Sequence, residues 1–221
     1  MKISLPLRLG IVVLCISTIC SAKDVVFEEV FTAKPGAEWE NVLKRGQPVV
    51  QPLENGEPAL RINNHVLGHS LSSPLKEYFE LEVEALHGET GAFLWFGAFD
   101  PLLEKGYAVG WQAPAGQSNG RFGIYKVKLE PGEKPEILFT GPDGSRQAEI
   151  LGAEVKSQHG TLAEPPAKLK LVWNKADGSL VLSCDGEELA RVADSDVTEF
   201  EGVLLSGNKK SIYRSVKIQG K

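Results

Sequence analysis

The chain is poor in cysteine and methionine, with three cysteines and one methionine among 221 residues. Cys15 and Cys20 lie in the first 22 residues, so Cys184 is the only cysteine in residues 23–221. No disulfide can form within residues 23–221, and such a domain depends on its hydrophobic core for stability. We expect a core of sufficient size, because chains of about 200 residues bury roughly 70% of their unfolded surface.

An excess of basic residues is also missing, since 24 Lys and Arg residues stand against 29 Asp and Glu residues, for a net charge of -5. A nucleic-acid-binding protein would show a clustered basic face, so the composition argues against a nucleic-acid partner. The sequence contains no glycine-rich phosphate loop or dinucleotide fingerprint, and we expect no cofactor. It also lacks apolar residues at helical spacing over three turns, which argues against a helical fold.

The first 22 residues are typical of a secretory signal peptide. Lys2 and Arg8 give a basic start, residues 9–20 are almost entirely apolar, and small residues precede position 23. The apolar run is too short to span a bilayer, which takes about 20 such residues. We predict cleavage after Ala22, a secreted or periplasmic product, and no membrane span in residues 23–221.

A lipid anchor on Cys20 or Cys15 is an alternative processing route. Ile19 and Leu14 precede these cysteines and are bulkier than that processing favours. We therefore prefer simple cleavage.

Hydrophobic residues recur with the two-residue period of β-strands. Residues 78–86 alternate strictly, and residues 92–99 are apolar on both faces, as in a strand at the middle of a sandwich. Residues 168–192 read as a three-stranded meander, in which Asp185-Gly186 suits the positive φ angles of a two-residue turn. Many short strands separated by turn residues predict an all-β fold, an antiparallel two-sheet β-sandwich or jelly roll.

We expect a single domain over residues 23–221. Proline and glycine break up most of residues 129–167, which we interpret as a long excursion between strands. Excursions of this length often carry function.

The order of the strands resembles that of a known group of exported sandwiches. Tyr-Phe-Glu-Leu-Glu-Val-Glu-Ala at residues 78–85 is followed by an apolar strand at residues 91–97. The later landmarks are Gly106-Tyr107, Gly123-Ile124-Tyr125, Trp173-Asn174, Asp185-Gly186, Glu201-Gly202-Val203 and residues 213–218. This pattern is similar to the 3-keto-disaccharide hydrolase domain family, within the concanavalin A-like lectin/glucanase fold. The resemblance implies an exported protein that engages carbohydrate and, if it is an enzyme, a glycoside hydrolase type of activity.

Two other classes of function stay open. The domain could bind carbohydrate without catalysis, or it could be a structural or adhesion module of the cell envelope that needs no site. The sequence leaves the oligomeric state open.

Glu80, Glu82 and Glu84 are the candidate catalytic acids, because they project from one face of a strand. Neighbours on such a face are about 6.7 Å apart along the strand. Glycosidases use carboxylate pairs at roughly 5–5.5 Å or 6.5–9.5 Å, depending on stereochemistry. The alternative is the solvated outer face of a half-buried strand, which the absence of large aromatics on that face would favour.

Trp95, Tyr107, Trp111 and Tyr125 are the candidate sugar-contacting aromatics, on three consecutive strands. Aromatic rings on a concave sheet pack well against the apolar faces of sugars. Arg121 shares a face with Tyr125, so we expect both to be exposed or to line a groove. The alternative is that Trp95 and Trp111 belong to the core.

No metal site is predicted. His65 and His69 could share a metal on a helix, but Asn63-Asn64 and Gly68 oppose a helix there, and we expect surface histidines. His87 and His159 are interpreted likewise. Asp194 and Asp196 could contact calcium, but two carboxylates fall short of the six to eight oxygen ligands that calcium takes.

Cys184 ends an alternating apolar segment. We expect it to be a buried structural thiol.

Overall fold

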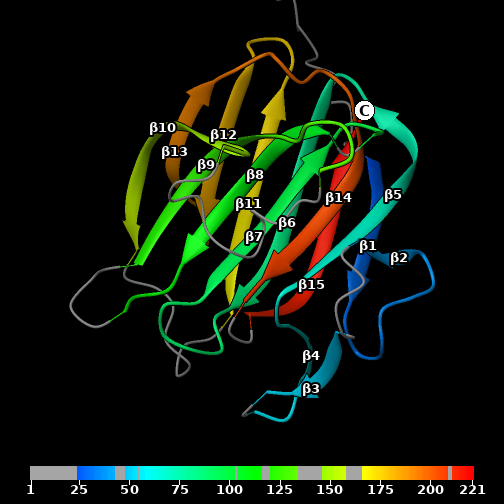
Figure 1. The fold of residues 1–221 in the computed structure, drawn as a ribbon, viewed down its shortest axis with the longest axis vertical. Helices are drawn as coiled ribbons and strands as arrows, with labels where there is room; N and C mark the ends of the chain where they lie inside the picture. The colour runs from blue at the N-terminus through cyan, green and yellow to red at the C-terminus, as the bar shows by residue number, and fades with distance from the viewer. Residues whose placement is uncertain are drawn as a thin grey trace, which may run out of the picture.

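The computed structural model describes residues 24–42, 48–53, 55–102, 104–115, 120–133, 146–157, 166–208 and 211–221. Within these ranges every regular element is a β-strand, and the strands form two antiparallel sheets packed face to face (Figure 1). This confirms the predicted all-β sandwich. The predicted signal peptide, residues 1–22, its cleavage site and His159 lie outside the described residues. No helix in the described ranges is long and apolar enough to cross a membrane.

The first sheet, here called sheet A, has eight strands. Their order is β13 (Glu187–Ala193), β12 (Ser179–Cys184), β11 (Ala167–Asn174), β6 (Tyr78–Leu86), β15 (Ser211–Gly220), β4 (Pro58–Ile62) and β3 (Val49–Pro52), with β1 (Asp24–Val30) also paired to β15. The β12–β13 turn has φ angles of 50° at Asp185 and 88° at Gly186. Both are positive, as the Asp-Gly pair predicts.

The second sheet, sheet B, has seven strands and lies in front of sheet A in Figure 1. Their order is β10 (Ala148–Ser157), β9 (Gly120–Lys128), β8 (Lys105–Gln112), β7 (Phe93–Phe99), β14 (Phe200–Gly207), β5 (His65–Leu75) and β2 (Trp39–Asn41). The central strand is β7, which confirms the position predicted for residues 92–99. Strand β10 lies within the segment interpreted as an excursion.

The main core fills the space between the sheets. The inward side chains of β6 are fully buried and alternate with half-buried glutamates on the outer face of sheet A. Phe79 and Trp173 from sheet A meet Phe200 from sheet B, with ring centroids 4.7 and 4.9 Å from that of Phe200. Edge-on contacts of this kind join the two layers.

Sheet B is also buried on its outer face. A second apolar cluster lies there, separate from the main core, and it contains Val66, Trp95, Phe99, Ala108, Tyr125, Val127, Leu129 and Leu204. The strands at the middle of sheet B therefore carry apolar side chains on both faces. Sheet A is apolar on its inner face alone over β6 and β11.

His87 is fully buried, which corrects the expectation of a surface histidine. It continues the inward alternation of Phe79 to Ala85, so its ring enters the core and lies 4.2 Å from the ring of Trp111. Among the described residues, neither ring nitrogen has a hydrogen-bond partner. Burial lowers the pKa of His87 to about 3. His65 is buried as well, and burial lowers its pKa.

We predict that His87 makes the fold acid-sensitive. Between pH 6.5 and about 3 the unfolded chain binds a proton at this side chain and the folded chain does not. The free energy of unfolding should therefore fall as the pH drops through this window, by up to about 1.4 kcal/mol per pH unit from this group. His87→Leu should remove that contribution and raise stability at pH 7, because a buried unpaired polar group disappears.

Urea unfolding of both proteins at pH 7.5, 5.5 and 4.5 measures the effect. The difference in stability between His87→Leu and the natural chain should widen toward pH 4.5. A difference that stays constant with pH would contradict the prediction.

Candidate functional site

Two glycines create the site on the outer face of sheet B. Trp95, Gly110 and Gly123 lie opposite one another across β7, β8 and β9. A Cβ atom on Gly110 would lie 2.8 Å from the Trp95 ring, and one on Gly123 would lie 2.6 Å from the Tyr125 ring. The two aromatic rings thus cover the glycine backbone, and they meet edge to face with centroids 4.9 Å apart.

A polar group of four side chains adjoins this aromatic pair. Gln112, Arg121, Tyr125 and Glu154 form it, and we call it the Arg121 cluster. The Tyr125 hydroxyl donates to Glu154 Oε1 at 2.6 Å, and Arg121 Nη1 donates to Glu154 Oε2 at 2.9 Å. Arg121 Nε also donates to Gln112 Oε1 at 2.6 Å. The side chains of Arg121 and Glu154 are 29% and 27% exposed, so the cluster is accessible to a ligand.

A bulge in β10 brings Glu154 into the cluster. Ile150 pairs with Tyr125 before the bulge, Val155 pairs with Phe122 after it, and Gly152 has a φ of 80° between them. The bulge adds two residues to β10, so Glu154 stays on the face of Ile150 and Tyr125 and lies beside Gly123, between Arg121 and Tyr125.

The Arg121 cluster offers fixed hydrogen-bond donors and acceptors together. The guanidinium of Arg121 donates, the carboxylate of Glu154 accepts, and the charges of the two groups cancel. An electrically neutral ligand rich in hydroxyl groups matches this arrangement.

The structure divides the predicted aromatics between the two faces of sheet B. Trp95 and Tyr125 lie on the outer face together with Arg121, as the alternation predicts for Arg121 and Tyr125. Trp95 is fully buried and Tyr125 is 4% exposed. Trp95 therefore supports the Tyr125 ring from the side, and Tyr125 reaches the cluster through its hydroxyl.

Tyr107 and Trp111 lie on the other face, in the core between the sheets, so the expectation that they belong to one sugar platform is corrected. Trp111 stacks on Phe122 with centroids 5.2 Å apart. The physical reason is size, because the alternate positions of β8 are glycine and alanine and only the large residues can fill the core. Burial and the hydrogen bond to Asp194 raise the pKa of Tyr107 well above its usual value.

Glu80, Glu82 and Glu84 lie on the outer face of sheet A, on the far side of the core from the Arg121 cluster. Lys170 Nζ lies 2.5 Å from Glu80 and 3.1 Å from Glu82. Lys168 lies 3.7 Å from Glu84. No tryptophan shares this face, since all four belong to the main core or to the outer cluster of sheet B. Tyr78 does share it, and its hydroxyl donates to Glu80 Oε2 at 2.7 Å. Glu82 and Glu84 also line a pocket of about 360 Å³ together with Lys168 and Arg214. The lysine pairs match the alternative of a solvated charged face, and a catalytic role of these acids stays a prediction.

Lys126 lies where a cation between Asp194 and Asp196 would be. Its Nζ is 2.8 Å from an oxygen of each carboxylate, and Asp194 also accepts a hydrogen bond from Tyr107. Burial opposes ionisation of Asp194, but the bonds from Lys126 and Tyr107 hold its pKa below the usual value. The described residues contain no group of three or more side chains suited to a metal ion.

His65 and His69 lie on strand β5, as their glycine and asparagine neighbours predict. Four residues of a strand span about 13 Å, which separates the two rings too widely for one metal ion. His69 instead stacks on Phe27, with ring centroids 3.8 Å apart.

Cys184 is buried, as predicted. Burial raises the pKa of its thiol to about 12. A thiol with so high a pKa stays protonated and is a poor nucleophile.

Sequence reasoning missed Gln112 and Glu154 as parts of the site. The sequence held a signal for Gln112, because alternation along the strand places it on the same face as Gly110. In the structure it pairs with Arg121 across β8 and β9. Glu154 carried a similar signal, because alternation places it on the same face as Ile150, but most of residues 129–167 were interpreted as an excursion and the segment was not paired with residues 120–128.

No family model and no curated protein sequence matches the chain. Solved structures do match. The carbohydrate-binding module CBM66 from Bacillus subtilis is 14% identical with a TM-score of 0.53, over 83% of this chain and 96% of that one. A protein of unknown function with a galectin-like fold, also from Bacillus subtilis, is 10% identical with a TM-score of 0.59, over 90% and 98%. β-Agarase A from Zobellia galactanivorans is 7% identical with a TM-score of 0.55, over 90% and 89%. The likenesses show that this chain has the concanavalin A-like lectin/glucanase fold.

We predict that Gly123→Ala destabilises the protein by about 1–3 kcal/mol, because the new methyl group would displace the Tyr125 ring. Tyr125→Phe should destabilise the protein by about 1.5–3 kcal/mol, since it removes the hydroxyl that donates to the charged Glu154 carboxylate. Urea denaturation measures both values. Equal stability of Gly123→Ala and the natural chain would show that the glycine is not needed to seat the ring.

Proposed function

We propose that this chain is an exported carbohydrate-binding β-sandwich that holds sugar hydroxyls at the Arg121 cluster. The observation that carries the proposal is the pairing of Arg121 and Glu154, which are partly exposed and fixed against Gln112 and Tyr125. Side chains already held in place lose little conformational entropy when a ligand binds. The signal-peptide pattern of residues 1–22 supports export.

The electrostatics of the cluster favour a neutral sugar over an anionic one. Arg121 and Glu154 neutralise each other at 2.9 Å, so neither a phosphate nor a carboxylate would find an uncompensated guanidinium. Vicinal hydroxyl groups, which donate and accept at once, could bond both partners without separating them. The fold is shared with proteins whose names describe carbohydrate binding and agar hydrolysis, which supports this ligand class.

Hydrolysis of a 3-keto-disaccharide or another glycoside is the second candidate. It is favoured by Glu154, a carboxylate positioned by Arg121 and by the Tyr125 hydroxyl. A glycosidase of the usual kind needs two carboxylates beside the scissile bond, and Glu154 is the only carboxylate among the four side chains of the cluster. We therefore place binding first.

We predict that Arg121→Ala and Glu154→Gln each weaken carbohydrate binding at least about ten-fold, since each removes a charged hydrogen-bonding group. A glycan array identifies the ligand, and isothermal titration calorimetry of that ligand measures the affinities. The matched controls are Arg191→Ala and Glu188→Gln, which break a similar ion pair on β13 of sheet A. Loss of binding in the controls, or retention in the Arg121 and Glu154 variants, would refute this location of the site.

We predict no sugar release from either 3-keto or ordinary glycosides by the natural chain. Product formation that Glu154→Gln abolishes would establish the hydrolase instead. Product formation lost in Glu82→Gln or Glu84→Gln would return the catalytic role to the outer face of sheet A. No binding and no turnover would leave a structural or adhesion module of the cell envelope.

A further inference from the structure

A cavity of about 410 Å³ lies between the segment that leads into β2, strand β2 itself, Leu67 of β5, and Pro48, which precedes β3. Strand β2 is the edge of sheet B, and Pro48 leads into β3, the edge of sheet A. The cavity is lined by Lys34, Pro35, Gly36, Ala37, Trp39, Asn41, Pro48 and Leu67. Its volume falls in the range of small-molecule pockets, about 300–1,000 Å³.

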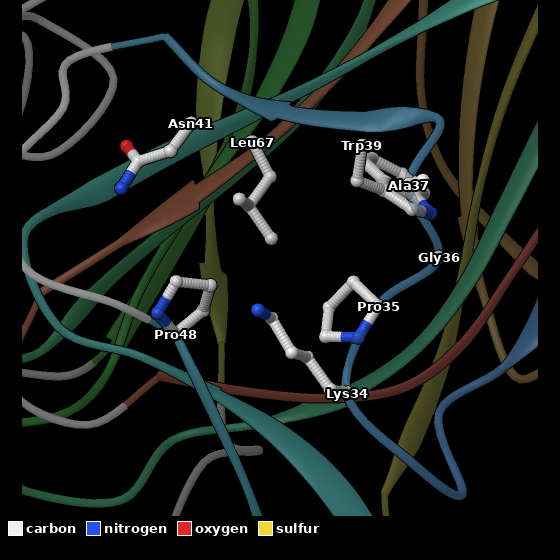
Figure 2. A pocket seen from close by; sticks show the side chains of 8 residues that line it. All are labelled: Lys34, Pro35, Gly36, Ala37, Trp39, Asn41, Pro48 and Leu67. Carbon is white, nitrogen blue, oxygen red and sulfur yellow. The ribbon is translucent and has the colours of Figure 1, made fainter.

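The walls of the cavity are mostly apolar and rigid. Pro35 and Pro48 stand on two sides, and Leu67 points in from a third (Figure 2). The Trp39 indole is held in place. Its Nε1 donates a hydrogen bond to Glu29, and its ring centroid lies 5.9 Å from that of Phe31. A preformed wall of this kind lowers the entropy cost of binding.

A single cation reaches into this apolar space. The Lys34 side chain points toward the middle of the cavity (Figure 2). No acidic residue is among the described residues that line it. Glu38 packs against Gly36 at the rim, but it is not part of the lining. No described residue forms a salt bridge with Lys34.

We propose that this cavity binds a small organic carboxylate with an apolar body. The carboxylate pairs with the Lys34 ammonium, and the apolar body packs against Trp39, Pro48 and Leu67. A hydroxylated ligand fits less well, because Lys34 and Asn41 are the polar side chains among the described lining residues, apart from the Trp39 indole, whose N–H already donates to Glu29. The proposal is independent of the Arg121 cluster, whose own charges cancel.

The test uses 3-phenylpropanoate and its neutral amide, 3-phenylpropanamide, titrated into the natural chain by calorimetry. We expect the acid to bind at least about ten-fold more tightly than the amide. Lys34→Gln should lower the affinity for the acid about ten-fold and leave the amide unchanged. The matched control Lys175→Gln, which removes an exposed lysine on the β11–β12 turn, should alter neither affinity.

Further arms separate the parts of the proposal. Ala37→Trp fills the cavity from an exposed position and should abolish binding of both probes. Glucuronate has the same charge with a hydroxylated body and should bind at least about ten-fold more weakly. Arg121→Ala should leave binding of the acid unchanged, so failure here is distinguishable from failure of the carbohydrate site. No binding of 3-phenylpropanoate at millimolar concentration, or equal affinity of acid and amide, would overturn the proposal.

Discussion

The central constraint on this structure is that the middle of sheet B is apolar on both faces. Its outer face must also let large aromatic rings lie directly against the backbone, which requires residues without side chains beneath them. Gly110 and Gly123 meet that constraint, because they are paired across β8 and β9 and carry no side chains. The rings of Trp95 and Tyr125 occupy the space that two Cβ atoms would need. The Tyr125 hydroxyl consequently reaches Glu154, and the polar cluster follows from the glycine pair.

The two outer faces of the sandwich carry charge in different ways. On sheet A the register places Lys170 and Lys217 opposite Glu82, so each strand neutralises its neighbour along an extended surface. Cross-strand pairs of this kind contribute a few tenths of a kcal/mol each and solvate the sheet. On sheet B the charges of Arg121 and Glu154 stand at the margin of an apolar cluster. A ligand can there combine hydrogen bonds with apolar contact.

The sequence predicts the layers well and the site in part, for reasons that differ between residues. Alternation assigns β6 correctly, because its outward residues are glutamates and its inward residues are apolar. Alternation does not decide the faces of β8, because both are apolar. Trp111 follows the alternative that places it in the core, and Tyr107 lies in the core as well instead of on a sugar platform. The small residues Gly106, Ala108 and Gly110 alternate with them. Since only large side chains can fill the core, this pattern indicates that Tyr107 and Trp111 point inward. Glu154 shares the alternation of Ile150, but its position beside Gly123 depends on a two-residue bulge, which the sequence pattern does not reveal.

Topology separates the two proposed sites. The Arg121 cluster spans β8, β9 and β10, at one edge of sheet B, whereas the Lys34 cavity adjoins β2, at the opposite edge. Strands β7 and β14 lie between them, because Leu67 of β5 lines the cavity, and neighbouring strands are about 4.8 Å apart. The separation between the two sites across these strands therefore exceeds the range of about 7–10 Å within which side chains couple strongly. Ligands at the two edges should therefore bind independently, so that one chain can hold a sugar at one edge and a carboxylate at the other.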